Sequence, residues 1–139
     1  MTEVSRPTEV RLRWQGGERF AADAGGVELA IDGSSPEHLS PMQAVALGVA
    51  GCMSVDVATI LAKGRQPVES LEVELTGTRA QTPPRRFLAL RIHYRVRGAV
   101  DPAKVERAIA LSRDTYCSAW QSMRTDIELE TSFEIEAPR

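Results

Sequence analysis

Residues 40–65 decide the fold of this chain, and they read SPMQAVALGVAGCMSVDVATILAKGR. Ser40 and Gln43 form a capping box, with a proline at the first helical position between them. Nearly every residue from Met42 to Ala62 is apolar or small, and Lys63-Gly64-Arg65 ends the run with basic groups and a glycine. The stretch therefore predicts a helix roughly 30 Å long. Its position explains Ser40 as a cap rather than as a nucleophile.

This helix is apolar on most of its faces, so most of its sides must be covered. A domain of 139 residues buries only about two thirds of the surface that its unfolded chain exposes. We therefore expect a second copy of the chain to complete the cover, which predicts a homodimer. A membrane span is the competing interpretation. Asp56, two glycines and the amphipathic segments on either side of the helix argue against it.

Segments that alternate apolar and polar residues flank the helix and predict strands, with glycine pairs and other turn formers between them. The order of elements predicts a single α+β domain over residues 1–139, with mainly antiparallel sheets around a long buried central helix. The expected strands are Glu9–Trp14, Arg19–Ala24, Val27–Ile31, the hairpin Val68–Arg79 with Arg86–Arg97, and Asp126–Glu136; Asp32–Leu39 is an expected loop, and further helices are expected from Asp101 to about Arg113 and from Thr115 to about Met123.

Charge and local motifs exclude several classes of function. The net charge of −2 comes from 17 basic and 19 acidic residues that are interspersed, so we expect neither nucleic acid nor a membrane as partner. Met1–Val10 has no apolar core of a secretory signal, which predicts a cytoplasmic protein. The chain has no CxxC, HExxH or phosphate-loop motif, so no metal or other cofactor is expected. His38 and His93 have no ligand-spaced partners and are interpreted as surface or sheet residues.

The two cysteines are the candidate reactive residues, because the cytoplasm keeps thiols reduced. Cys52 lies halfway along the apolar helix, where a small core residue is the alternative interpretation. Cys117 lies near the start of a predicted short helix, where a helix N-terminus lowers a thiol pKa. A partly buried structural residue is the alternative there.

These motifs, in this order, resemble the OsmC/Ohr family, particularly its YhfA-type branch. The matching residues are SPMQ at 40–43, GCMSVDV at 51–57, KGRQ at 63–66 and YCS at 116–118. The resemblance spans roughly residues 10–136, nearly the whole chain. It implies an α+β fold in which two chains intertwine, with the long helices packed centrally.

The resemblance also implies a chemistry. Cys52 matches the cysteine that attacks an organic hydroperoxide as a thiolate, and Cys117 matches the one that resolves the sulfenic acid into a disulfide, which an external dithiol then reduces. Arg19 is the nearest match to the arginine that holds the thiolate, although a solvated hairpin residue is the alternative. The family glutamate that orients this arginine has no counterpart, because its two possible positions are Met42 and Gln43.

Two functions remain open from the sequence. One is thiol-dependent reduction of organic hydroperoxides by Cys52 and Cys117 at a dimer interface. The other is a noncatalytic dimer that senses oxidants or binds a small ligand through the same pair. Retention of both cysteines favours the first function, and the missing glutamate favours the second.

Overall fold

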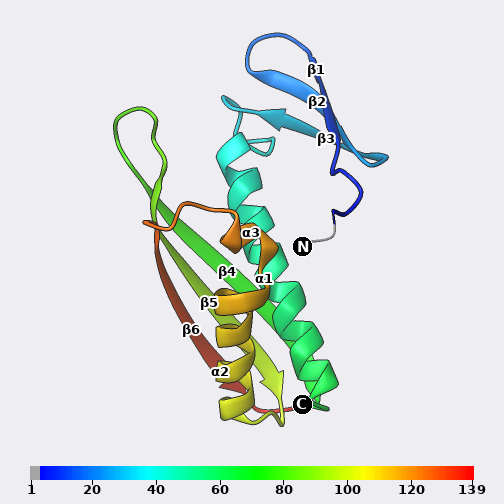
Figure 1. The fold of residues 1–139 in the computed structure, drawn as a ribbon, viewed down its shortest axis with the longest axis vertical. Helices are drawn as coiled ribbons and strands as arrows, with labels where there is room; N and C mark the ends of the chain where they lie inside the picture. Colours follow the sequence, from blue (N-terminus) through cyan, green and yellow to red (C-terminus); the bar gives the residue numbers. More distant parts are fainter. Residues whose placement is uncertain (1–3) are drawn as a thin grey trace. The chain divides into compact units, whose positions relative to one another are not determined.

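The computed structural model describes residues 4–139 (Figure 1). Residues 1–3 of the Met1–Val10 segment, for which no secretory signal is predicted, lie outside the described residues. Within the chain, one compact unit ends at Val45, and a second runs from Ala46 to Arg139.

The first unit contains a three-stranded antiparallel meander. Its strands are β1 (Val10–Trp14), β2 (Arg19–Ala24) and β3 (Val27–Asp32), hydrogen-bonded in that order. Gly25 and Gly26 connect β2 to β3 with φ values of 61° and 91°. A two-residue hairpin turn of this kind requires positive φ at both positions, which glycine adopts without steric cost. The three strands predicted from alternation and glycine pairs are confirmed.

One face of this small sheet has no apolar cover within the unit. Val10, Leu12 and Trp14 alternate along β1, so their side chains lie on one face of the strand. They are 60%, 52% and 65% exposed. Among the described residues of the unit, only Ala22 and Asp32 are buried. A three-stranded sheet needs an apolar face packed against something to be stable, so this face requires a partner surface.

The second unit is built on a sheet with the order β4-β5-β6. Strands β4 (Val68–Arg79) and β5 (Phe87–Gly98) pair antiparallel, which confirms the predicted hairpin. Strand β6 (Glu128–Glu136) pairs parallel to β5, so this pairing departs from the antiparallel pattern that prevails elsewhere. The reason is that the chain returns from β5 through helices, and a helical crossover brings the next strand back in the same direction.

The connection between β5 and β6 differs from the two helices that were predicted there. Helix α2 (Pro102–Leu111) runs directly into a π-helix, η1 (Ser112–Tyr116), and α3 (Ser118–Gln121) begins only after Cys117. The Cys117 amide donates to the Ser112 carbonyl at 2.8 Å, an i to i−5 hydrogen bond that closes the wider turn. The predicted break at residues 113–115 was therefore wrong, and Cys117 precedes α3.

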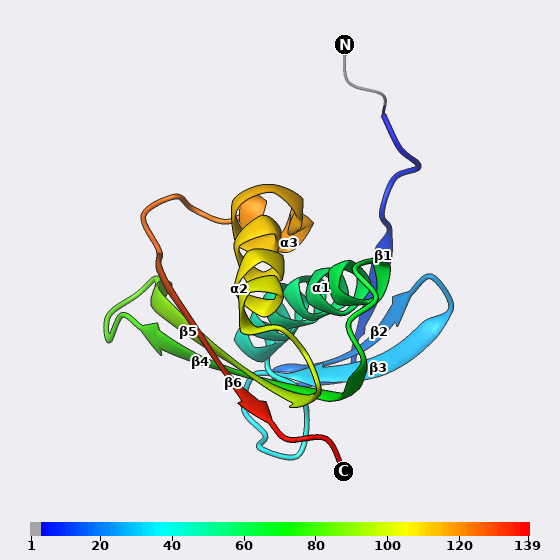
Figure 2. The same cartoon turned by 90° about the horizontal axis from the view of Figure 1, so that it is seen from below.

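Helix α1 (Pro41–Lys63) begins in the first unit, and its Ala46–Lys63 part belongs to the second. In the second unit this part of α1 and helix α2 lie on the same face of the β4–β6 sheet (Figure 2). Side chains from α1, α2 and β5 form the core, each no more than 3% exposed. They are Val49, Met53, Val57 and Leu61 of α1, Ile92, Tyr94 and Val96 of β5, and Val105, Ala108 and Ile109 of α2.

A single chain covers only one stripe of α1. The four buried residues of α1 recur every four positions, as expected for one helical face. Leu47 and Val55, on another face, are 62% and 65% exposed. Apart from the neighbouring residues and the backbone of the helix itself, no heavy atom of the described residues lies within 4 Å of where a side chain at Gly48 or Gly51 would begin. The predicted burial of α1 on most sides is thus not achieved within one chain.

The packing of β5 against β4 generates a prediction at Gly77. A methyl group at this position would lie 2.6 Å from Cε1 of the buried Phe87 ring and 3.2 Å from Leu90. We expect Gly77→Ala to lower the free energy of unfolding by about 1–3 kcal/mol through overpacking. Denaturant unfolding would measure the change. Thr76→Val, an exposed neighbour on the same strand, is the control and should change it by less than about 0.5 kcal/mol. Equal stability of both variants would contradict this packing.

Candidate functional site

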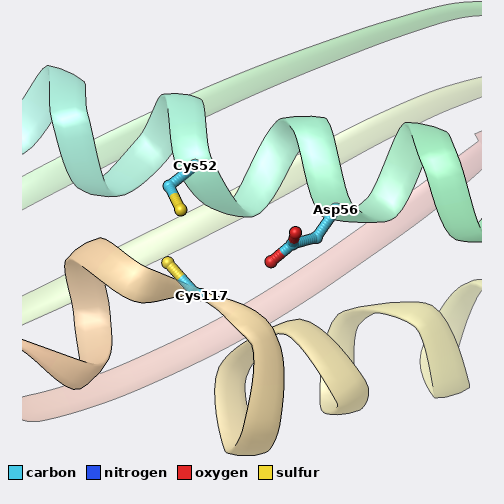
Figure 3. Close-up of side chains that lie close together, drawn as sticks. All are labelled: Cys52, Asp56 and Cys117. Atoms are coloured by element: carbon cyan, nitrogen blue, oxygen red, sulfur yellow. The ribbon is translucent and has the colours of Figure 1, made fainter. Parts of the chain in front are cut away.

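Two thiols and a carboxylate converge in the second unit. Cys52 and Asp56 are four residues apart on α1, so their side chains project from the same side of the helix. Cys117 approaches from the segment between η1 and α3. Figure 3 shows the two sulfur atoms pointing toward one another, with the Asp56 carboxylate beside them. One ligand-type atom from each residue, the Sγ atoms and a carboxylate oxygen, lies within 4.8 Å of the other two.

Local hydrogen bonds fix the position of Cys117. Its backbone is extended, with φ −70° and ψ 102°, between the π-helix and α3. Its amide is held by the Ser112 carbonyl, and its carbonyl accepts from the Gln121 amide at 2.9 Å. Its Sγ accepts from the Trp120 amide at 3.3 Å, so the thiol itself serves as the cap of α3. The π-helix therefore directs this sulfur toward α1.

Burial dominates the ionisation of Cys117. The residue is fully buried, and this burial raises the pKa of its thiol to about 11. The hydrogen bond from the Trp120 amide lowers the pKa, while Cys52 and the negative charge of Asp56 raise it. The expectation that a helix N-terminus would favour the Cys117 thiolate was wrong. The four-residue α3 contributes one donor, which does not offset desolvation.

Asp56 is a site residue that sequence reasoning did not identify. Its Oδ2 accepts a 2.7 Å hydrogen bond from the Oγ of Ser112, which is fully buried. This bond holds the carboxylate in place next to the thiols. A signal for Asp56 was present, because it is the one charged residue within the apolar run and stands four positions after Cys52. Ser112 carried no such signal.

Tyr94 of β5 is a buried polar residue whose ionisation Cys117 and Asp56 influence. Its side chain is fully buried, and its hydroxyl has no hydrogen-bond partner among residues 4–139. Burial raises the pKa of this hydroxyl, and electrostatic interactions with Cys117 and Asp56 raise it further, against an opposing effect of Arg113. The hydroxyl therefore lies within the electrostatic field of the cluster.

Arg19, the predicted clamp, lies at the start of β2 in the first unit. One of its terminal nitrogens lies 2.8 Å from Nε2 of His38. Because a guanidinium only donates, this ring nitrogen is the acceptor and the proton of the neutral imidazole resides on Nδ1. His38 is thus bound to Arg19 rather than being an isolated loop residue. The role of Arg19 toward a thiolate stays a prediction.

Gln43 acts as a cap, as the sequence predicted. Its Oε1 accepts from the Ser40 amide at 2.9 Å, and the Ser40 hydroxyl accepts from the Gln43 amide at 3.1 Å. Both halves of the capping box are formed. The side chain at this position is therefore committed to the helix start.

The ionisation of Cys117 predicts its reactivity. With a pKa of about 11, only about 0.1% of this thiol is ionised at pH 8. We expect iodoacetamide at pH 8 to modify Cys52 first and to leave Cys117 unmodified in the folded protein, as measured by peptide mass spectrometry. Unfolding in guanidinium is the control and should make both cysteines react. Faster modification of Cys117 than of Cys52 in the folded protein would contradict the burial described here.

Comparisons with known proteins place this chain in a family. The family model described as OsmC-like protein matches residues 33–132. Protein YhfA of Escherichia coli K12 is 36% identical over 132 residues, which cover 93% of this chain and 98% of that protein. A hypothetical protein from Aquifex aeolicus VF5 superposes with a TM-score of 0.90 at 27% identity, covering 97% of this chain and all of that one.

An organic hydroperoxide resistance protein from Elizabethkingia anophelis shares the fold, with a TM-score of 0.75 at 14% identity over 97% of this chain and all of that one. Among the described residues, α1 alone is long and apolar enough to cross a membrane. The superpositions identify α1 instead as the core helix of a small soluble fold. The family model and the similarity to YhfA over nearly the whole chain show that this protein belongs to the OsmC-like family.

Proposed function

We propose that this protein reduces organic hydroperoxides with thiols, with Cys52 as the attacking and Cys117 as the resolving residue. The observation that carries the proposal is the convergence of the two sulfur atoms, which lie at most 4.8 Å apart. A disulfide requires about 2.05 Å, so a shift of less than about 3 Å joins them. The fold of an organic hydroperoxide resistance protein in a related solved structure supports the choice of substrate class.

The difference in burial supports the two proposed roles. Cys52 is partly exposed, whereas Cys117 is fully buried. A peroxide arriving from solvent therefore reaches the Cys52 sulfur first. Cys117, held behind it by the π-helix, is placed to react with whatever forms on Cys52. The apolar residues of α1 around Cys52 favour an alkyl peroxide over hydrogen peroxide.

The proposed reaction has two steps on the enzyme. The Cys52 thiolate attacks the peroxide, the O–O bond breaks, and the sulfur is oxidised to a sulfenic acid. The alkoxide that leaves takes up the proton that the Cys52 thiol released, and it departs as an alcohol. The Cys117 thiol then attacks the Cys52 sulfur, the S–S bond forms, and water leaves. An external dithiol reduces the disulfide and is oxidised in turn. The cytoplasm, where thiols are kept reduced, is the expected location.

Asp56 supplies a base for the second step. Burial keeps Cys117 protonated, with a pKa of about 11, so its proton must be removed as it attacks. The Asp56 carboxylate oxygen lies within 4.8 Å of the Cys117 sulfur. In our proposal it accepts this proton directly or through one water. The Ser112 hydroxyl keeps the carboxylate oriented meanwhile.

We further propose that two copies of the chain form the active unit. The exposed apolar residues of α1 and the uncovered face of β1 belong to different units, and both need a partner surface. A second copy covers both. In such a dimer Arg19 would act as the clamp for the Cys52 thiolate, since one terminal nitrogen contacts His38 and the guanidinium has four further N–H donors.

A noncatalytic redox sensor or small-ligand-binding dimer is the second candidate. The observation that favours it is the state of Gln43, which is neutral and engaged in the capping box. It leaves no glutamate at the helix start to orient an arginine. In this function the thiol pair would be oxidised once, without efficient turnover.

Single-cysteine variants test the two roles. We expect Cys52→Ser to abolish consumption of cumene hydroperoxide, because no thiolate remains to attack the O–O bond. Cys117→Ser should retain one oxidation, stop at the sulfenic or sulfinic acid, and lose sustained turnover with a dithiol. Mass spectrometry after one equivalent of peroxide would show which sulfur gains oxygen. The control is hydrogen peroxide, which should react more slowly. Equal reactivity of the two thiols, or none in the unmodified protein, would contradict the peroxidase proposal.

The dimer is tested at the exposed face of α1. We expect sedimentation velocity at micromolar concentration to show a dimer, and Leu47→Asp with Val55→Asp to shift it to the monomer, because two charges on an apolar interface are not solvated. Lys104→Asp, at an exposed position of α2, is the control and should leave the dimer intact. A folded monomer of the unmodified chain under these conditions would rule out the proposed assembly.

A further inference from the structure

We propose that Cys52, Asp56 and Cys117 form a binding site for Zn²⁺. The three residues offer two sulfur ligands and one carboxylate oxygen, all within 4.8 Å of one another. Zinc favours such ligands at about 2.0–2.3 Å in a tetrahedral arrangement, which separates them by roughly 3.5–3.8 Å. A contraction of about 1 Å, small for side chains on two different elements, completes the coordination. Three protein ligands leave the fourth position open.

The hydrogen bond from Ser112 orients the Asp56 carboxylate for binding a metal. It reaches Oδ2 of Asp56 at 2.7 Å from a fully buried hydroxyl. Within the described residues the second carboxylate oxygen accepts no hydrogen bond, so it is available to a metal. Carboxylates that ligate metals are typically oriented by such a partner. Cys117 is oriented likewise by its backbone hydrogen bonds in the π turn.

The Tyr94 hydroxyl is an independent observation that points to a ligand. The hydroxyl is fully buried and has no hydrogen-bond partner in the described part of the chain, and Cys117 and Asp56 both raise its pKa. Buried polar groups are nearly always satisfied. A water or hydroxide bound together with zinc is one acceptor that would satisfy this O–H.

The charges in the cluster also suit a cation. A divalent ion stabilises two thiolates and a carboxylate at once, and these three ligands lie within 4.8 Å of one another. Arg113, the cation whose charge acts on Tyr94, already donates to Asp114 at 2.8 Å and to Thr131. Its guanidinium is therefore committed elsewhere. The sequence predicted no metal site because the ligands come from distant segments and form no local motif.

Zinc at this site would hold the sulfur atoms apart and prevent the S–S bond from forming. The metal site shares its thiols with the proposed peroxide chemistry, but zinc binding does not depend on that chemistry. Zinc would then act as a reversible block that protects the reduced pair from oxidation.

The test uses the reduced, chelator-treated full-length protein. Zinc added in competition with a chromophoric chelator should bind one ion per chain, with a dissociation constant of about 1 μM or tighter. Co²⁺ as a probe should give a thiolate-to-cobalt charge-transfer band and the visible spectrum of a tetrahedral ion. Zinc should also raise the melting temperature. No charge-transfer band, or no saturable zinc binding, would overturn the proposal.

Asp56→Asn is the informative variant, because asparagine still accepts the Ser112 hydrogen bond while losing the anionic ligand. We expect the zinc dissociation constant to rise at least about tenfold and the cobalt spectrum to change. Glu106→Gln, at an exposed position of α2, is the control that loses the same charge, and it should bind zinc like the unmodified protein. Equal zinc affinity of Asp56→Asn and the unmodified chain would overturn the site. Oxidation of the zinc-free thiols by peroxide is measured separately, so failure of one proposal does not decide the other.

Discussion

Packing of one stripe of α1 is the constraint on which the site depends. Val49, Met53, Val57 and Leu61 are each no more than 1% exposed, so α1 cannot rotate about its axis without exposing them. Cys52 and Asp56 directly precede two of these residues along the chain. The burial of their neighbours therefore sets the direction in which both side chains leave the helix, and the Ser112 hydroxyl then holds the Asp56 carboxylate in place. A rigid helix of this kind holds functional side chains more precisely than a loop does.

The opposite side of the site is made by an irregular element. A regular α-helix through residues 112–117 would have i to i−4 hydrogen bonds in place of the i to i−5 bond. It would therefore turn the Cys117 side chain away from α1. The π turn closed by the Ser112 carbonyl instead lets one residue serve twice, since the Ser112 backbone positions Cys117 and its hydroxyl holds Asp56. Wide turns of this type are costly in isolation and are commonly found at functional sites.

The sequence predicted the regular part of this architecture and missed the irregular part. The capping box at Ser40 and Gln43 formed with both hydrogen bonds, because its geometry is local and its residue types are specific. The alternating strands were found for the same reason. The π turn before Cys117 was missed because it is defined by one i to i−5 bond that leaves no periodic pattern.

The parallel pairing of β6 and the place of Tyr94 depend on contacts between distant segments, which alternation alone does not specify. The meeting of Cys52 with Cys117 was likewise expected from a family resemblance and not from their spacing. Sequence patterns thus located the elements that carry the site, whereas its geometry required the tertiary structure.

The distances within the Cys52–Asp56–Cys117 cluster are compatible with both proposed chemistries, disulfide formation and zinc binding. Sulfur atoms at most 4.8 Å apart are farther apart than a disulfide, at about 2.05 Å, requires. The same limit leaves room for the roughly 3.8 Å that two thiolates adopt around zinc.

Asp56 matters in both cases, since a carboxylate can take the proton that Cys117 releases or can bind the metal that replaces it. Oxidation removes the thiolates that would bind a metal, and a bound metal occupies the thiolates that would attack a peroxide. The two proposed states of the site would therefore exclude one another, with the reduced, metal-free trio as the branch point between them.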